Sequence, residues 1–326
     1  MTAAISSKLI RVGHSPDPDD AFMFYALAKQ KIPMQDFRVE HVIEDIESLN
    51  QRALRGELEV TAVSCHAYPY LCDRYAVMRS GASVGDQYGP ILVGKRQGAG
   101  DKTEGSDTES RDSVRFRQKL DVSVRTESQG NEQINIRGKK IAVPGKLTTA
   151  YLVLQLYSAT EKADPPYGGE KDFEPVFIPF DQIFDAVLSG KADLGLVIHE
   201  GQITYQEKGL SKIVDLGEWW FEKYQLPLPL GVDVIRRDLG KETIESFSQL
   251  FKESIQYALD HRKEALDYAL QYGRGIDQNL GDQFVGMYVN HYTVDLGKQG
   301  EAGLQKLLDE GYEKGIVPRA VKLEFV

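Results

Sequence analysis

The stretch Leu228-Pro-Leu-Gly-Val-Asp-Val-Ile235 decides the expected fold, because it has the character of a β-strand yet comes just before a long run of helices. The residues upstream of it form a second α/β unit, so a strand here indicates that the chain returns to a sheet begun near the N-terminus. We therefore predict an α/β protein of two lobes, joined by two crossovers, with a cleft between them. Residues 1–94 together with 232–326 are expected to form the first lobe, and residues 135–231 the second.

The N-terminal segment alternates short apolar runs with helical stretches, which is typical of α/β units. We expect four clear elements in it, namely strands over residues 9–13, 37–43 and 60–64 and a helix over 46–54. A further helix is expected to begin at Pro18, because proline suits the first helical position, with Asp17 as its capping residue.

The composition excludes several classes of partner. The chain has 326 residues with 39 Lys or Arg and 49 Asp or Glu, so its formal net charge is −10. Since no basic stripe offsets this charge, we expect neither nucleic acid nor a membrane surface as a partner. Residues 1–11 lack the pattern of a secretory leader, so we expect a cytoplasmic protein. Two cysteines, Cys65 and Cys72, are too few for a disulfide scaffold. The composition leaves the oligomeric state open.

A polar insertion over residues 95–134 separates the two lobes in the sequence. Gly, Ser, Asp, Glu, Lys and Arg dominate it, and a stretch of this composition cannot build a core. We expect its arms to be disordered, while the alternating segments 114–117 and 120–124 could pair as a hairpin.

Polar residues follow expected strands, at the place where open α/β sheets bind ligands. His199 ends an apolar strand and could act as a base near neutral pH, or could be a hydrogen-bonded structural histidine. Thr148 and Thr149 begin a helix, where backbone N–H groups and hydroxyls could hold a carboxylate, or where a threonine simply caps the helix. Ser64 ends another buried strand, as a ligand contact or as part of a capped junction.

Other chemistry has less support in the sequence. We find no phosphate loop, dinucleotide fingerprint, nucleophile elbow or zinc-binding helix motif, so no cofactor is expected. Trp219 and Trp220 are next to a Pro-rich turn and could line the binding site of an aromatic ligand, or could pack in the core.

The predicted architecture resembles that of periplasmic binding proteins, here without an export signal. Motifs spread over the chain outside residues 95–134 carry a second resemblance; they include Ser15-Pro-x-Pro18, Glu44-Asp-Ile-Glu47, Val143-Pro-Gly145, Thr148-Thr-Ala-Tyr151, Ile198-His-Glu200 and Leu226-Pro-Leu-Pro-Leu-Gly231. In this combination they resemble the 1,4-dihydroxy-6-naphthoate synthase family of the futalosine route to menaquinone.

The resemblance implies a lyase without a cofactor, acting on a small carboxylated substrate. Its expected reaction splits cyclic dehypoxanthine futalosine into 1,4-dihydroxy-6-naphthoate and a sugar-derived fragment. Carried over by position, the implied site residues are the proton acceptor His199, the substrate-lining Ala62, Val63 and Ser64, and the substrate-binding Thr149 and Ala150.

Three positions depart from the family pattern. Asp17 and Asp19 stand where the family has Cys and Asn, and Ala62 stands where many relatives have Lys. Extra acids and a missing cation disfavour an anionic ligand nearby, so one alternative is the related dehydratase of the same pathway that acts on chorismate. From a different class, the chain could be a non-catalytic solute-binding protein for a small carboxylate, which would retain its ligand without turnover.

Overall fold

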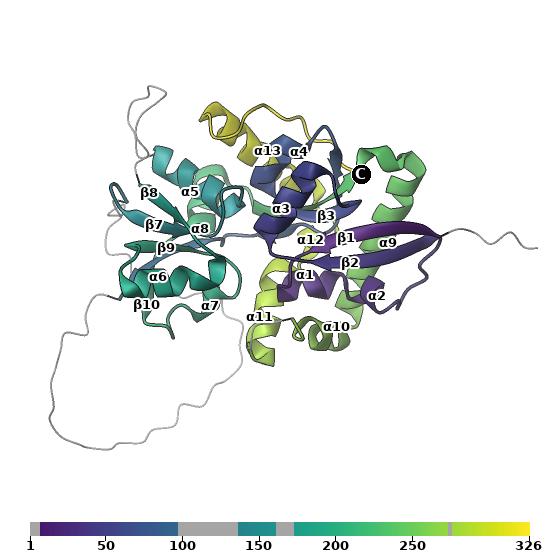
Figure 1. The fold of residues 1–326 in the computed structure, drawn as a ribbon, viewed down its shortest axis with the longest axis horizontal. Coiled ribbons are helices and arrows are strands. Elements are labelled where there is room, and N and C mark those ends of the chain that lie inside the picture. The colour runs from purple at the N-terminus through teal and green to yellow at the C-terminus, as the bar shows by residue number, and fades with distance from the viewer. Residues whose placement is uncertain (1–6, 97–135, 161–172, 273–275) are drawn as a thin grey trace, which may run out of the picture.

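The structure, a computed structural model, describes residues 7–96, 136–160, 173–272 and 276–326. Two separate β-sheets, each accompanied by helices, give the molecule two lobes (Figure 1). This is the two-lobed α/β architecture that the sequence predicts. The hairpin expected in the polar insertion lies outside the described residues.

The first sheet combines N-terminal strands with one strand from much later in the chain. Its strand order is β2-β1-β3-β11-β4, with β5 paired to β11. The strands are β1 (Lys8–His14), β2 (Phe37–Ile43), β3 (Val60–Ser64), β4 (Tyr75–Val77), β5 (Ser83–Gly85) and β11 (Leu228–Arg236). Strand β1 is parallel to β2 and β3, whereas β11 is antiparallel to β3 and β4. The stretch at residues 228–235 thus crosses back to the first sheet, and it lies inside that sheet.

Helices cover both faces of this sheet. One group packs against Ile10 and Val12 of β1 and comprises α1 (Pro18–Met23), α2 (Tyr25–Ala28), α9 (Lys241–Asp260), α10 (Arg262–Ala269) and α11 (Gln278–Tyr288). The other group packs against Val63 of β3 and comprises α3 (Ile46–Arg55), α4 (Tyr68–Leu71) and α13 (Gly297–Glu313), with the short α12 (His291–Val294) between the groups. None of the helices in the described ranges has the length and apolar composition needed to span a bilayer.

The second sheet has the order β10-β6-β9-β7-β8. Its strands are β6 (Ile91–Lys95), β7 (Lys140–Val143), β8 (Glu174–Phe177), β9 (Leu194–Val197) and β10 (Leu210–Asp215). The helices of this part of the chain are α5 (Thr149–Thr160), α6 (Ile183–Ser189), α7 (Gly201–Thr204) and α8 (Leu216–Tyr224).

The pairing of β6 bears on the division into lobes. We expected residues up to 94 in the first lobe, whereas β6 pairs with β9 and β10 in the second sheet. An apolar run of five residues suits either sheet, so the sequence pattern does not reveal this membership. We therefore propose that the chain first crosses between the lobes before residue 91 and crosses back between α8 and β11.

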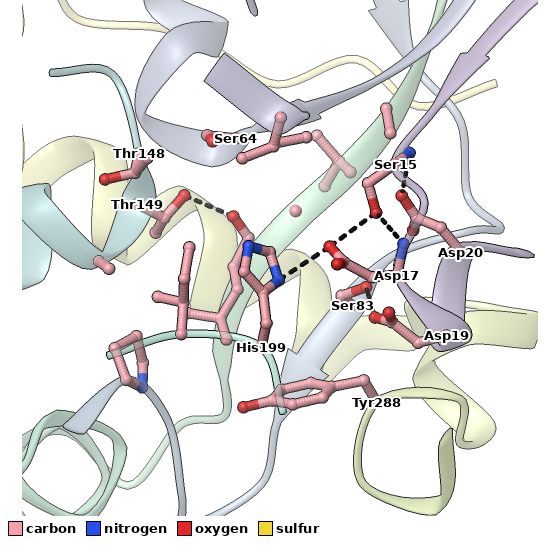
Figure 2. Close-up of a pocket in the computed structure, with 18 of the residues that line it drawn as sticks. Ser15, Asp17, Asp19, Asp20, Ser64, Ser83, Thr148, Thr149, His199 and Tyr288 are labelled. Atoms are coloured by element: carbon pink, nitrogen blue, oxygen red, sulfur yellow. Dashed lines mark hydrogen bonds and ion pairs between the residues drawn. The ribbon is translucent and has the colours of Figure 1, made fainter. Parts of the chain in front are cut away.

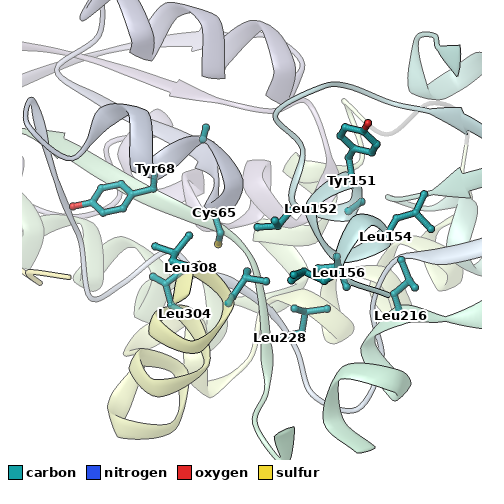
Figure 3. Packing of buried hydrophobic residues seen from close by; sticks show 14 of the residues in the cluster. Cys65, Tyr68, Tyr151, Leu152, Leu154, Leu156, Leu216, Leu228, Leu304 and Leu308 are labelled. Carbon is teal, nitrogen blue, oxygen red and sulfur yellow. The ribbon is translucent and has the colours of Figure 1, made fainter. Parts of the chain in front are cut away.

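One apolar cluster extends from lobe to lobe. Leu152 and Leu156 of α5 belong to the same buried cluster as Leu304 and Leu308 of α13, with Leu228 at the start of β11 beside them (Figure 3). Burial of one such side chain is worth about 1.5–3 kcal/mol. The cluster therefore holds α5, the helix that begins with Thr149, against the first lobe.

Candidate active site

A cavity lies between the lobes, where β1, β3 and β9 end (Figure 2). The residues that line it include five of the predicted ones, Ala62, Ser64, Thr149, Ala150 and His199. Val63 lies outside the lining, because successive residues of a strand face opposite sides of the sheet and the Val63 side chain is buried in the apolar cluster.

His199 follows the buried strand β9 and enters the cavity from the second lobe. Its φ of 60° lies in the left-handed region. Residues other than glycine rarely adopt this backbone conformation, and where they do, the position is often part of a functional site. Its Nδ1 lies 2.8 Å from Oδ2 of Asp17, which belongs to the first lobe. The ring of Phe180 meets the imidazole edge-on, with a distance of 4.8 Å between the ring centroids.

Asp17 precedes α1 but does not cap it. The sequence predicts a capping side chain here, whereas the structure shows no hydrogen bond from the Asp17 side chain to the helix. The carboxylate turns to His199 instead, and the hydroxyl of Ser15 donates to Asp17 Oδ2 at 2.8 Å. A contact with the imidazole across the cavity has thus replaced the local contact that the residue type favours.

Two more carboxyl groups lie beside this pair. Asp20 accepts a hydrogen bond from the backbone N–H of Ser15 at 2.8 Å, and Asp19 accepts one from the hydroxyl of Ser83 at 3.3 Å. Burial, together with the neighbouring carboxylates, raises the pKa of Asp19 well above its usual range. Burial also raises the pKa of Asp20, to about 6. The first-lobe wall of the cavity is therefore acidic, but ionisation of all its carboxyl groups at once is unfavourable.

The pKa of His199 results from opposing effects. Burial lowers it, but the charge of Asp17 and the hydrogen bond to Asp17, with smaller contributions from Glu200 and Asp19, raise it. The net result is a pKa above the ordinary value of histidine. A base with a raised pKa binds the proton it removes more tightly.

Ser64 is held by a buried asparagine that sequence reasoning had not assigned to the site. Asn50 of α3 donates from Nδ2 to the Ser64 hydroxyl at 3.1 Å and accepts the Ser64 backbone N–H at 2.9 Å. Because the Ser64 oxygen accepts from Asn50, its hydroxyl hydrogen can be directed to a ligand. Asn50 is fully buried, so this arrangement is fixed by packing as well as by hydrogen bonds.

The two threonines at the start of α5 have different partners. Thr148 accepts the backbone N–H of Tyr151 at 3.4 Å and therefore caps the helix. Thr149 donates its hydroxyl to the carbonyl of Leu230 on β11. The N–H groups of Thr149 and Ala150 come first in the helix, where no carbonyl within the helix is available to them, so they suit an anion.

Two other cavity residues carry no signal in the sequence. Tyr288 of α11 donates its hydroxyl to the side-chain oxygen of Gln202 in α7, and both line the cavity. Each lies in a helix as an unremarkable polar or aromatic residue, and only the fold brings them together. The tryptophans lie elsewhere: Trp220 is buried in the apolar cluster, and neither Trp219 nor Trp220 lines the cavity.

Comparisons with known proteins agree with the motifs in the sequence. The chain matches the model of a family described as menaquinone biosynthesis over residues 10–118 and 120–313. It is 34% identical over 317 residues to a 1,4-dihydroxy-6-naphthoate synthase from Thermus thermophilus, covering 97% of this chain and 99% of that protein. It is 32% identical over 314 residues to one from Streptomyces coelicolor, covering 96% of each.

Solved structures show the same relationship at the level of the fold. A protein from Archaeoglobus fulgidus matches with a TM-score of 0.77 and 43% identity, covering 95% of this chain and 98% of that one. The alkanesulfonate-binding protein of Xanthomonas axonopodis matches with a TM-score of 0.63 and 11% identity, covering 98% of each chain. The periplasmic aliphatic sulfonate-binding protein of Escherichia coli matches with a TM-score of 0.59 and 13% identity, covering 97% and 90%. The fold is therefore that of the periplasmic binding proteins.

Proposed function

The chain belongs to the menaquinone biosynthesis family, and from this premise we propose that it converts cyclic dehypoxanthine futalosine to 1,4-dihydroxy-6-naphthoate. The reaction is a carbon–carbon cleavage that releases a sugar-derived fragment. Both relatives carry the name of the enzyme that forms this naphthoate, and they match this chain over nearly their whole length.

The observation that carries the proposal is the position of His199 in the cavity. Since Nδ1 is engaged by Asp17, Nε2 is the ring nitrogen available to take a proton from a bound substrate. Removal of that proton opens the substrate ring, and formation of the aromatic naphthoate drives the cleavage forward. Base catalysis is worth roughly 10²–10⁴-fold, so positioning and electrostatics supply the rest of the rate.

The charges around the cavity suggest how the substrate lies. Figure 2 shows His199 between the carboxylates of Asp17 and Asp19 on one side and Thr149 on the other. The substrate carboxylate would be repelled by the acids and attracted by the N-terminus of α5 and the hydroxyl of Ser64. We therefore place the carboxylate near Thr149 and Ser64, and the uncharged sugar-derived part near the acidic wall.

The test is turnover of cyclic dehypoxanthine futalosine by the purified protein, followed by the absorbance and mass of the naphthoate. We predict that His199→Asn keeps the fold and most of the binding but lowers turnover by roughly 10²–10⁴-fold, as expected for a lost base. His261→Asn is the matched control, because His261 is exposed and stacks on Tyr257 away from the cavity.

Other results would redirect the assignment. Turnover by His199→Asn at close to the parent rate would show that another residue is the base. Binding of the substrate by the parent without turnover would favour a solute-binding protein. Conversion of chorismate in its place would favour the related dehydratase.

A further inference from the structure

We propose that Asp17 is the positioning residue for His199, acting from the opposite lobe, and this inference rests on the proposed role of His199 as the base. Asp17 Oδ2 lies 2.8 Å from His199 Nδ1, and the two side chains are only 5% and 15% exposed. A carboxylate bound to Nδ1 keeps a proton on that nitrogen and leaves the lone pair on Nε2. The pair therefore selects the tautomer in which Nε2 can act as a base.

The surroundings hold Asp17 ready for this contact. Ser15 donates its hydroxyl to Asp17 Oδ2 at 2.8 Å, and the same oxygen of Ser15 accepts the Asp17 backbone N–H at 3.1 Å. Pro18 follows Asp17, and the residue before a proline is restricted to an extended conformation, observed here as φ −71° and ψ 149°. The carboxylate is thus fixed before a ligand arrives.

The imidazole is also in contact with Phe180. The ring of Phe180 lies edge-on to it, with an interplanar angle of 74°. With Asp17 on Nδ1 and Phe180 against the ring, rotation of the side chain would break the ion pair. The pair joins a residue before α1 to a residue after β9, so the base is complete only when the two lobes are closed on each other.

The protons balance in the step in which His199 takes a proton from the substrate. A proton passes from the substrate to Nε2, the Nδ1 proton stays on nitrogen, and Asp17 remains a carboxylate that stabilises the imidazolium. The ring also interacts electrostatically with three other acidic residues, Asp19, Asp20 and Glu200. The attraction of Asp17 is the largest of the effects that raise the pKa of His199. Removal of the Asp17 charge should therefore lower the pKa of His199 more than removal of any other single charge.

Nuclear magnetic resonance of histidine-labelled protein tests the pair without substrate. The His199 signal is assigned by its loss in His199→Asn, and its titration is compared between the parent and Asp17→Asn. We expect a lower pKa of His199 in Asp17→Asn and a smaller decrease in the matched variant Asp19→Asn. An unchanged pKa in Asp17→Asn would overturn the proposal.

The parent protein alone provides a second measurement, which does not depend on whether Asp17→Asn folds. Above the pKa of His199, nitrogen chemical shifts should show the neutral ring with its proton on Nδ1. A neutral ring with its proton on Nε2 would also overturn the proposal.

Kinetics then separate this proposal from the proposed function. In Asp17→Asn, kcat should fall by roughly 10²–10⁴-fold with a smaller change in KM, and the acidic limb of the pH profile of kcat/KM should move to lower pH. If the parent turns over the substrate but the acidic limb of the pH profile does not move in Asp17→Asn, the role of Asp17 is refuted and the proposed function remains. Absence of parent turnover would refute the proposed function, while the nuclear magnetic resonance result would still decide the pair.

Discussion

The hydroxyl of Thr149 connects the two walls of the cavity. It donates to the carbonyl of Leu230 and accepts, at 3.4 Å, the backbone N–H of His66. Leu230 lies on β11 and His66 follows β3, so both contacts are with the first lobe, whereas Thr149 begins the main helix of the second. One side chain therefore lines the cavity and also joins the lobes.

We predict that Thr149→Val weakens substrate binding more than it slows conversion of the bound substrate. Valine keeps the shape of the side chain but removes the hydroxyl, and with it both of these hydrogen bonds, which hold the start of α5 at the cavity. One hydrogen bond is worth about 0.5–1.5 kcal/mol, and a loss of this order in substrate binding should raise KM about two- to tenfold while kcat changes less. Steady-state kinetics measure this, with Thr149→Ser, which keeps the hydroxyl, as the control. A large fall in kcat at constant KM would assign Thr149 to the chemical step instead.

The predicted cavity residues share a local signal, and the residues that were missed lack one. Ser64 is the last residue of the apolar strand β3, and His199 follows the apolar strand β9; the ends of strands are where open α/β sheets bind ligands. Asp17 has the local pattern of a helix cap, and its pairing with His199 requires the two lobes to be placed first. Asn50 is a buried polar residue in an amphipathic helix, and its partner is known only from the fold.

The connection between β6 and β7 returns to a point close to where it leaves. Gly94 of β6 and Ile141 of β7 both lie beside Leu194 of β9, on its two sides. Adjacent strands are about 4.8 Å apart, so these two residues are separated by about 10 Å. A flexible linker of about eight residues reaches roughly 15 Å and can therefore bridge the two strands.

We predict that replacement of residues 97–133 by such a Gly/Ser linker leaves folding and turnover close to those of the parent. The described ends of the connection keep their pairing, and the cost of closing a loop changes only slowly with its length. Soluble yield, melting temperature and turnover are the measurements. Loss of soluble protein, or of turnover in a folded variant, would show that this segment contributes to the lobe or to the site.

At the scale of elements, strand positions could be predicted and strand partners only in part. The strands expected over residues 37–43 and 60–64 coincide with β2 and β3, because their apolar runs are bounded by clear turn and helix signals. The return of β11 was also predicted. Its place between β3 and β4 was not, since strand order depends on pairing between distant segments that local patterns do not encode.

Across the whole molecule, buried carboxyl groups favour the folded state at low pH. Burial raises the pKa of Asp19 and Asp233 well above the usual range and that of Asp20 and Asp215 to about 6. A carboxyl with a raised folded-state pKa binds its proton more tightly when folded, so its contribution is lost as pH rises through that pKa. The raised pKa of His199 acts in the same direction.

Buried histidines oppose this trend at lower pH. Burial lowers the pKa of His14 to about 3 and that of His41 and His66 to about 4. Their contribution is fully present above the ordinary histidine value of 6.5 and is lost as pH falls below it. The contributions of Asp20 and Asp215 are largely lost by pH 6.5. Above pH 6.5, Asp19, Asp233 and His199 therefore decide how the free energy of unfolding changes with pH.

We predict that the free energy of unfolding falls from pH 6.5 to about pH 8, and that Asp233→Asn makes this fall smaller. Asp233 is 1% exposed, and its Oδ1 has no hydrogen-bond partner among the described residues, so its ionisation in the folded state is especially unfavourable. Urea unfolding at the two pH values measures the effect, with the exposed Asp36→Asn as the control. A slope in Asp233→Asn equal to that of the parent would contradict the prediction.

The central place of β11 in the first sheet has a consequence for how the protein is made. A chain leaves the ribosome from its N-terminus, so β3 and β4 emerge long before the strand that separates them. The second sheet needs only residues 91 to 215 and can form while the first still waits for residues 228 to 236. Until then β3 has an open edge, and an open strand edge invites pairing with other chains. The nascent protein is therefore exposed to misassembly through the edge of β3 for the whole interval between the emergence of β3 and the arrival of β11.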